Sequence, residues 1–169
     1  MRTAVLFIGA LVILGFFNIA IYQKEAILSQ GQPLYLAISA LDPRSMIQGD
    51  YMQFRYDIES EMREISSNEL QKNSSAVIKG DDNNIAHFVR LYDGKPLANN
   101  EKLIHYTYHV LDMRTIHIQP DSFLFQEGLA TLYKNAAFAI FQFKGAKDYL
   151  LSGLADKDLK EINPEVNEQ

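Results

Sequence analysis

The sequence predicts an α+β protein: a mostly antiparallel β domain with one packed amphipathic helix, preceded by an N-terminal transmembrane helix. Three observations lead to this prediction. The chain opens with a long apolar run, most later apolar residues alternate with polar ones, and near the C-terminus the apolar spacing becomes helical. With 169 residues, the chain has room for one domain of ordinary size and an appendage.

The first element is an apolar run from Ala4 to Tyr22 that contains no charged residue. As a helix it would extend about 28 Å, close to the roughly 30 Å hydrocarbon layer of a bilayer. A cleaved signal peptide would need a shorter apolar core and a small-residue cleavage site, and residues 18–23 offer no convincing site. We therefore expect an uncleaved signal-anchor over residues 1–23. Cleavage and a buried core helix are the alternatives.

Charge is distributed unevenly around this run. Arg2 precedes it, Lys24 and Glu25 follow it, and all 21 acidic residues lie beyond it. The short N-terminal tail favours an orientation with the N-terminus inside and the following domain outside the cytoplasm. With 15 of the 16 basic residues, that domain has a net charge of 15 − 21 = −6, which disfavours nucleic acid and anionic lipid as partners of the whole domain. The absence of Cys excludes disulfides and thiolate chemistry.

Beyond the anchor we expect three parts. A polar stem over residues 24–33 leads into a β-rich domain at residues 34–158, and a charged, flexible tail follows at residues 159–169. Composition gives no sign of an internal repeat or of a second domain boundary.

Two strands open the domain. Leu34–Ser39 alternates apolar residues with smaller or more polar ones, which is typical of a half-buried strand. A turn begun by Asp42 and Pro43 then leads to a second strand. Alternation divides this second strand into two faces, one with Met52, Phe54, Tyr56 and Ile58, the other with Tyr51, Gln53, Arg55 and Asp57.

The middle of the chain continues this pattern. Residues 60–70 are polar with few apolar positions, which favours a short surface helix. Alternation predicts further strands at Ala76–Lys79, Ile85–Tyr92, Leu103–Val110 and Arg114–Gln119, and a closing hairpin of Phe138–Lys144 and Tyr149–Leu154.

The apolar period changes between Gln126 and Ala137. Leu129, Leu132, Tyr133 and Ala136 follow the i, i+3, i+4, i+7 spacing of one helix face. This predicts an amphipathic helix of about three turns, packed against the sheet.

The stretch that leads into the second strand reads Gly49-Asp50-Tyr51-Met52-Gln53-Phe54-Arg55-Tyr56. This stretch resembles the signature of the GDYXXLXY family of membrane-anchored bacterial proteins, with Phe54 where the signature has leucine. The upstream Asp42-Pro43-Arg44-Ser45 and the downstream aromatic segment that ends in Glu127-Gly128 are also similar to the family. Together these motifs extend the resemblance over most of the chain.

The resemblance implies a bacterial cytoplasmic membrane protein with one N-terminal helix and an extracytoplasmic domain, periplasmic if the source has two membranes. The family has no assigned reaction. Its members tend to be encoded beside multi-pass membrane proteins, which implies a membrane protein partner.

Asp42, Arg44 and Asp50 flank one loop and form a candidate recognition corner, with Arg44 as a clamp for a partner carboxylate. The alternative is structural: Asp50 would bind local backbone N–H groups, and Arg44 would pair with an aspartate. Gly49 would supply a positive φ. Tyr51 and Tyr56 complete the candidate face, although core packing of the aromatic residues is the favoured reading.

A catalytic alternative pairs Ser45 with Lys79, because its surroundings faintly resemble the catalytic region of signal peptidases. The spacing of that family is missing, and Lys79 lies beside a turn rich in Asp and Asn that would keep it charged. We therefore expect no catalytic residue.

Three histidines invite comparison with a metal site. Residues four apart on a strand are about 13 Å apart, so His105 and His109 cannot share an ion, and only a cross-strand pair with His117 is possible. We expect exposed strand histidines and no metal. The Asp81–Asn84 stretch is expected to be a turn.

The sequence thus favours a non-enzymatic accessory domain, anchored in the membrane and bound to a membrane protein partner, without cofactor or nucleic acid. The alternative is a small-ligand or peptide-binding module whose cleft would be lined by Tyr51, Tyr56, Phe123 and Phe125.

Overall fold

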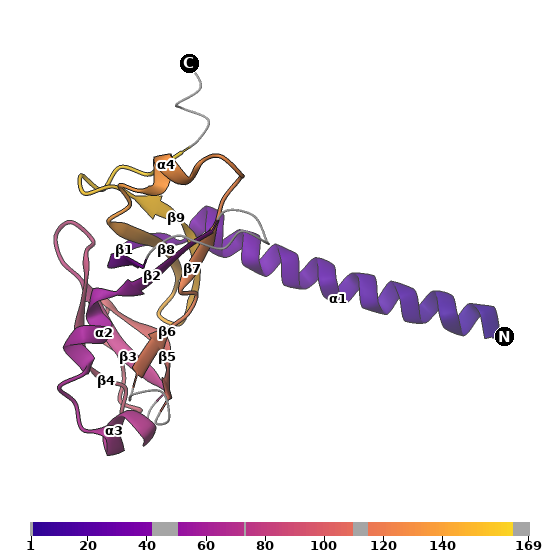
Figure 1. Ribbon diagram of the computed structural model, residues 1–169. Coiled ribbons are helices and arrows are strands. Elements are labelled where there is room, and N and C mark those ends of the chain that lie inside the picture. The colour runs from indigo at the N-terminus through magenta and orange to yellow at the C-terminus, as the bar shows by residue number, and fades with distance from the viewer. Residues whose placement is uncertain (1, 42–50, 73, 110–114, 164–169) are drawn as a thin grey trace.

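The computed structural model describes residues 2–41, 51–72, 74–109 and 115–163. Its first element, α1 (Arg2–Gln30), is one unbroken helix that projects from the side of a β-rich domain (Figure 1). The segment Leu6–Gln30 is long and apolar enough to cross a membrane, and no residue of its apolar window is buried. The apolar side chains of this window are therefore exposed, whereas a soluble protein would bury them in its core.

The domain contains two antiparallel sheets. The first has the strand order β7-β2-β1-β8-β9. Its members are β1 (Gln32–Leu41), β2 (Tyr51–Tyr56), β7 (Ser122–Leu124), β8 (Phe138–Lys144) and β9 (Asp148–Ala155). Every neighbouring pair in it is antiparallel, with Ile38 opposite Tyr56 and Leu36 opposite Ala139 on the two sides of β1.

The second sheet has the strand order β4-β3-β5-β6. It is made of β3 (Ser75–Gly80), β4 (Ala86–Leu91), β5 (Glu101–His109) and β6 (Thr115–Ile118). Hydrogen bonds join strands of one sheet to turns of the other: the Tyr35 N–H of β1 donates to Asn84 O in the β3–β4 turn at 2.8 Å, and the Leu103 N–H of β5 donates to Ala146 O in the β8–β9 turn at 2.7 Å. The turn between β8 and β9 therefore lies against β5.

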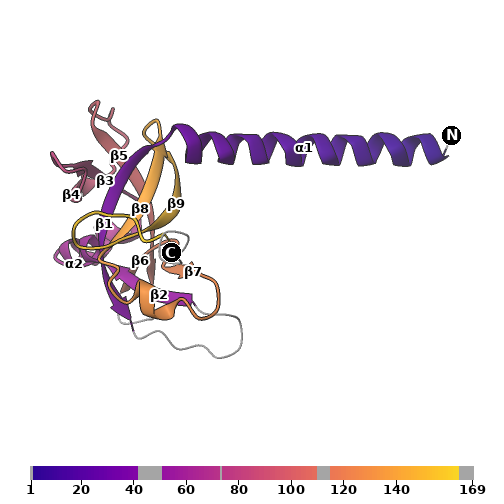
Figure 2. The same cartoon turned by 90° about the horizontal axis from the view of Figure 1, so that it is seen from above.

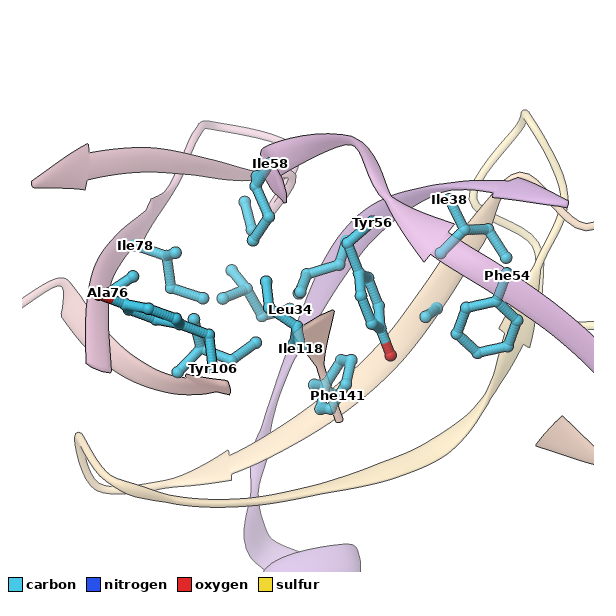
Figure 3. Packing of buried hydrophobic residues seen from close by; sticks show 14 of the residues in the cluster. Leu34, Ile38, Phe54, Tyr56, Ile58, Ala76, Ile78, Tyr106, Ile118 and Phe141 are labelled. Carbon is cyan, nitrogen blue, oxygen red and sulfur yellow. The ribbon is translucent and has the colours of Figure 1, made fainter. Parts of the chain in front are cut away.

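The core lies where the inner faces of the two sheets meet, as Figure 3 shows. Phe54, Tyr56 and Phe141 enter it from the first sheet, and Ile78 and Ile104 from the second. Alternation produces this arrangement, since successive strand residues point to opposite faces. The predicted α+β class, with a mostly antiparallel β domain behind a long apolar helix, is confirmed.

The single surface helix expected at residues 60–70 is wrong. The chain forms α2 (Asp57–Met62) and α3 (Ser67–Lys72) instead. The second strand ends at Tyr56, because Asp57 and Glu59 occupy the first turn of α2, where carboxylates favour a helix start. Ile58 and Met62, four residues apart, then both point into the core rather than to the surface.

The predicted three-turn helix at Gln126–Ala137 is also too long, because α4 (Ala130–Tyr133) is only four residues. Gly128 has φ +90°, which breaks a helix before α4, and the Ala137 N–H donates to Ala155 O after it. The apolar spacing nevertheless marks the covered side: Tyr133 is buried, and Leu129, Leu132 and Ala136 pack on the core. The three-residue strand β7 was not expected.

The junction between α1 and the domain is tight. Ala26 and Ile27 are buried where the last turns of α1 contact β8 and β9. The Gly31 N–H donates to Ile27 O at 2.9 Å, and β1 begins at the next residue. A Cβ on Gly31 would lie 2.4 Å from Ile27 O and 2.9 Å from the Cβ of Gln142. The residues expected to form a polar stem are thus helical up to Gln30, and two of them, Ala26 and Ile27, are buried.

Candidate functional site

The candidate face starts on β2, which lies between β1 and β7. Its inward residues are core: Phe54 has no exposed surface, and Tyr56 is 1% exposed. The rings of Phe54 and Tyr56 lie 5.5 Å apart in a T-shaped arrangement, and Phe141 lies 5.8 Å from Tyr56. Tyr56 is therefore buried and packs against both of these rings.

The Tyr56 hydroxyl donates a hydrogen bond to the carbonyl oxygen of Pro120. Burial, followed by the nearby carboxylates of Glu59 and Asp121, raises the pKa of this hydroxyl well above its ordinary value. The hydroxyl thus remains a protonated donor that ties β2 to the segment before β7. This is a structural task for the last tyrosine of the motif.

The outward side of β2 is different. Tyr51 is half-buried and pairs with Leu124 across the β2–β7 ladder, so their side chains share the outer face of the sheet. Leu124 is 72% exposed. In both Figure 1 and Figure 2, β7 lies on the side of the domain from which α1 projects. The Tyr51–Leu124 pair is therefore an apolar edge on the side of α1.

The predicted recognition corner of Asp42, Arg44 and Asp50 lies outside the described residues, and so do Pro43 and Gly49. Ser45 lies there too, so its pairing with Lys79 stays a prediction. Lys79 itself is exposed on β3, opposite His87 on β4 and Glu101 on β5.

The downstream aromatic residues pack inward. Phe125 stacks on Tyr133 with ring centroids 4.6 Å apart, and Phe123 lies 5.6 Å from the same ring. Both are partly buried against the core. Glu127 and Gly128 follow in an exposed turn. The positive φ of Gly128 explains why the aromatic segment ends in glycine.

The three histidines lie near one cavity of about 260 Å³, lined by His105, Tyr106, Thr107, His117, Gln119 and Tyr149. The Nδ1 atom of His105 lies 2.8 Å from the Ser75 hydroxyl, and the rings of His109 and His117 are 5.7 Å apart. Within the described ranges, no three His, Asp or Glu residues form a group that could hold a metal ion.

A buried carboxylate was missed by sequence reasoning. Glu59 in α2 is 3% exposed, and its Oε1 accepts the Ile118 N–H at 3.0 Å. Burial raises the pKa of Glu59, against the opposing effects of that hydrogen bond and of Arg55. The sequence pattern places residue 59 in no strand or helix, so strand alternation does not predict its burial.

A second cavity, of about 390 Å³, lies between α1 and the β8–β9 hairpin. Its lining residues are Tyr22, Gln23, Lys24, Ala26, Ile27, Lys144 and Asp148. It is placed where the apolar part of α1 ends and the helix begins to contact the domain. Sequence spacing could not reveal it, because residues more than a hundred positions apart form its two walls.

The fold and this geometry define a class: a β-rich domain built directly on the end of a long, uncovered apolar helix. Within that class the chain belongs to the GDYXXLXY family, since the family model described as GDYXXLXY protein matches residues 13–154. The match begins inside α1 and ends in β9, and so covers helix and domain together. No curated protein and no solved structure gives a significant match.

Proposed function

We propose that α1 anchors this protein in a bacterial cytoplasmic membrane and that the β-rich domain acts outside the cytoplasm as an accessory to a membrane protein. The observation that supports it most is the apolar helix itself, since Leu6–Gln30 is long and apolar enough to cross a membrane and no residue of its apolar window is buried. The arrangement of Arg2 before the span and the acidic domain after it favours the N-terminus inside.

The Tyr51–Leu124 edge supports the choice of partner. It presents an exposed apolar residue and a tyrosine on the side of the domain from which α1 projects (Figure 2). Tyrosine and apolar anchors are enriched at the centres of protein interfaces. Held by α1, the domain would present this edge to proteins in the same membrane at a high effective concentration.

Anchoring and orientation are tested together. The full chain, carrying a C-terminal epitope tag, is expressed in a bacterium, and its membranes are extracted with alkaline carbonate. We expect the tag to stay with the membrane pellet at the full mass of 19.3 kDa plus the tag. We also expect a protease added to intact spheroplasts to remove it. Release of a shortened chain by carbonate would show cleavage and overturn the anchor.

Partner binding is tested by a photoreactive amino acid at Tyr51 in intact membranes, with mass spectrometry of the products. Glu64 is the control position, because it is exposed and lies between α2 and α3, away from β7 (Figure 1). We expect one dominant membrane protein adduct from position 51 and none from 64. Equal patterns at both positions would contradict a partner edge at β2 and β7.

A further inference from the structure

The cavity between α1 and the β8–β9 hairpin has a basic character that the net charge of the domain hides. Lys24 lines the cavity from the helix, and Lys144 lines it from the end of β8. Figure 2 shows the β8–β9 turn beside the C-terminal end of α1. Both lysines thus line one cavity, from opposite walls.

Neither lysine is neutralised in the part of the chain that the structure describes. The salt bridges found there involve other cations, namely His87, Arg90 and Lys95. Lys144 Nζ donates to a neutral acceptor, Gln30 Oε1, at 3.3 Å. Asp148 also lines the cavity, but it makes no ion pair with either lysine within 4.0 Å. Two positive charges therefore face one negative charge in this cavity.

The position of the cavity along α1 determines which anions it can contact. The apolar run ends at Tyr22, and five residues of helix from there to Ile27 rise about 7.5 Å. The headgroup layer beyond the hydrocarbon is roughly 5–7 Å thick on each side of a bilayer. The helical wall of the cavity spans this layer if the apolar run fills the hydrocarbon. Tyr22 would then lie at the boundary, where aromatic residues are favoured.

Packing holds the cavity at that depth. Ala26 and Ile27 are buried at the contact with the domain, and Gly31 connects α1 to β1 without a flexible linker. The hairpin wall with Lys144 therefore keeps its height relative to the helix wall with Lys24. A headgroup phosphate in the cavity would lie between the helix wall that carries Lys24 and the hairpin wall that carries Lys144.

We propose that this cavity binds the headgroup of an anionic phospholipid, with Lys24 and Lys144 contacting its phosphate. The proposal rests on the membrane anchoring proposed above. The proposed site is compatible with the acidic net charge of the domain. Two lysines without ion-pair partners act on an anion within a Debye length, whereas more distant carboxylates are screened.

The test compares phosphatidylglycerol with phosphatidylcholine as probes. The full chain is purified in detergent with each lipid, and retained lipid is counted by native mass spectrometry. We expect a preference for phosphatidylglycerol that falls about tenfold or more in Lys24→Gln/Lys144→Gln, since each lysine near an anionic surface contributes roughly a factor of five. The charge-conserving variant Lys24→Arg/Lys144→Arg should keep the preference.

The matched control is Lys134→Gln/Lys157→Gln, which removes the same charge from two exposed lysines that do not line the cavity. It should keep the preference of the unchanged chain. Equal loss in both Gln variants, or equal loss for both lipids in Lys24→Gln/Lys144→Gln, would overturn the headgroup site. Carbonate extraction tests anchoring separately. If the full chain stays in the membrane pellet but shows no lipid preference, only this site is rejected. If carbonate releases the chain, both proposals are rejected.

Discussion

Glu59 is the residue whose burial has the clearest consequence for stability. Its carboxyl group lies in the core beneath β6, where burial disfavours the charged form and raises its pKa. A carboxyl group with a raised folded-state pKa stabilises the fold most below its unfolded pKa, which is about 4.3 for Glu. This contribution is lost as the pH rises through the folded-state pKa.

We therefore expect Glu59→Gln to stabilise the domain increasingly from pH 4 to pH 8. The amide keeps an oxygen that can accept the Ile118 N–H but carries no charge to desolvate. Urea unfolding of the full chain in detergent, followed by tyrosine circular dichroism at each pH, measures the difference. Glu61→Gln on the exposed side of α2 should shift stability by less than about 0.5 kcal/mol. A constant difference across this pH range would show that Glu59 is not desolvated.

Tyr56 and Tyr51 allow a comparison within one strand. Tyr56→Phe keeps the buried ring but removes the hydroxyl that donates to Pro120 O. We expect a loss of about 0.5–1.5 kcal/mol in unfolding free energy. Tyr51→Phe, on the outer face, should stay within about 0.5 kcal/mol. Equal effects in thermal unfolding would mean that the Tyr56 hydroxyl has no structural task.

At the scale of elements, the junction between α1 and β1 depends on the absence of a side chain at residue 31. A Cβ there would lie 2.4 Å from a backbone oxygen, so helix and strand must shift apart. We expect Gly31→Ala to destabilise the domain by about 1–3 kcal/mol, the usual cost of forced overpacking.

The control for this variant is Gly15→Ala in the same helix, where an added Cβ meets nothing within 4 Å. It should leave the unfolding midpoint of the domain in place. An unchanged midpoint for Gly31→Ala would indicate that the last turns of α1 are not fixed on the sheet.

Elements could be predicted where the pattern of neighbouring residues alone determines them. The inward set Met52, Phe54 and Tyr56 follows from alternation, and the structure confirms it. The prediction of a long helix at Gln126–Ala137 was wrong. The apolar spacing is correct, but Gly128 and the return of the chain to β8 limit the helix to one turn. β7 is too short for a period to be visible.

The candidate sites show the same division. The motif around Tyr51 could be found from the sequence because its residues are adjacent. The exposed state of Leu124 and the cavity shared by Lys24 and Lys144 depend on which strands become neighbours, and alternation leaves strand order open. Burial of Glu59 likewise depends on β6 packing over α2.

For the whole molecule, the tight junction means that helix and domain are not independent parts joined by a tether. Ala26 and Ile27 belong to the helix by sequence and to the domain by packing. The domain should therefore need the last turns of α1 for its full stability, even in the absence of a membrane. Two soluble fragments separate these contributions: one begins at Lys24 and keeps the packed turns, and the other begins at Gln32 and lacks them.

We expect both fragments to fold, with the fragment from Lys24 more stable by about 2–3 kcal/mol. The difference corresponds roughly to burying one isoleucine side chain and one methyl group. Urea unfolding of the two fragments measures it, and Ile27→Ala in the longer fragment should reproduce most of the loss. The exposed neighbour Leu28→Ala is the control for this substitution. If the two fragments unfold at the same urea concentration, the helix is only tethered to the domain. The cavity between α1 and the β8–β9 hairpin would then have no fixed height above the bilayer.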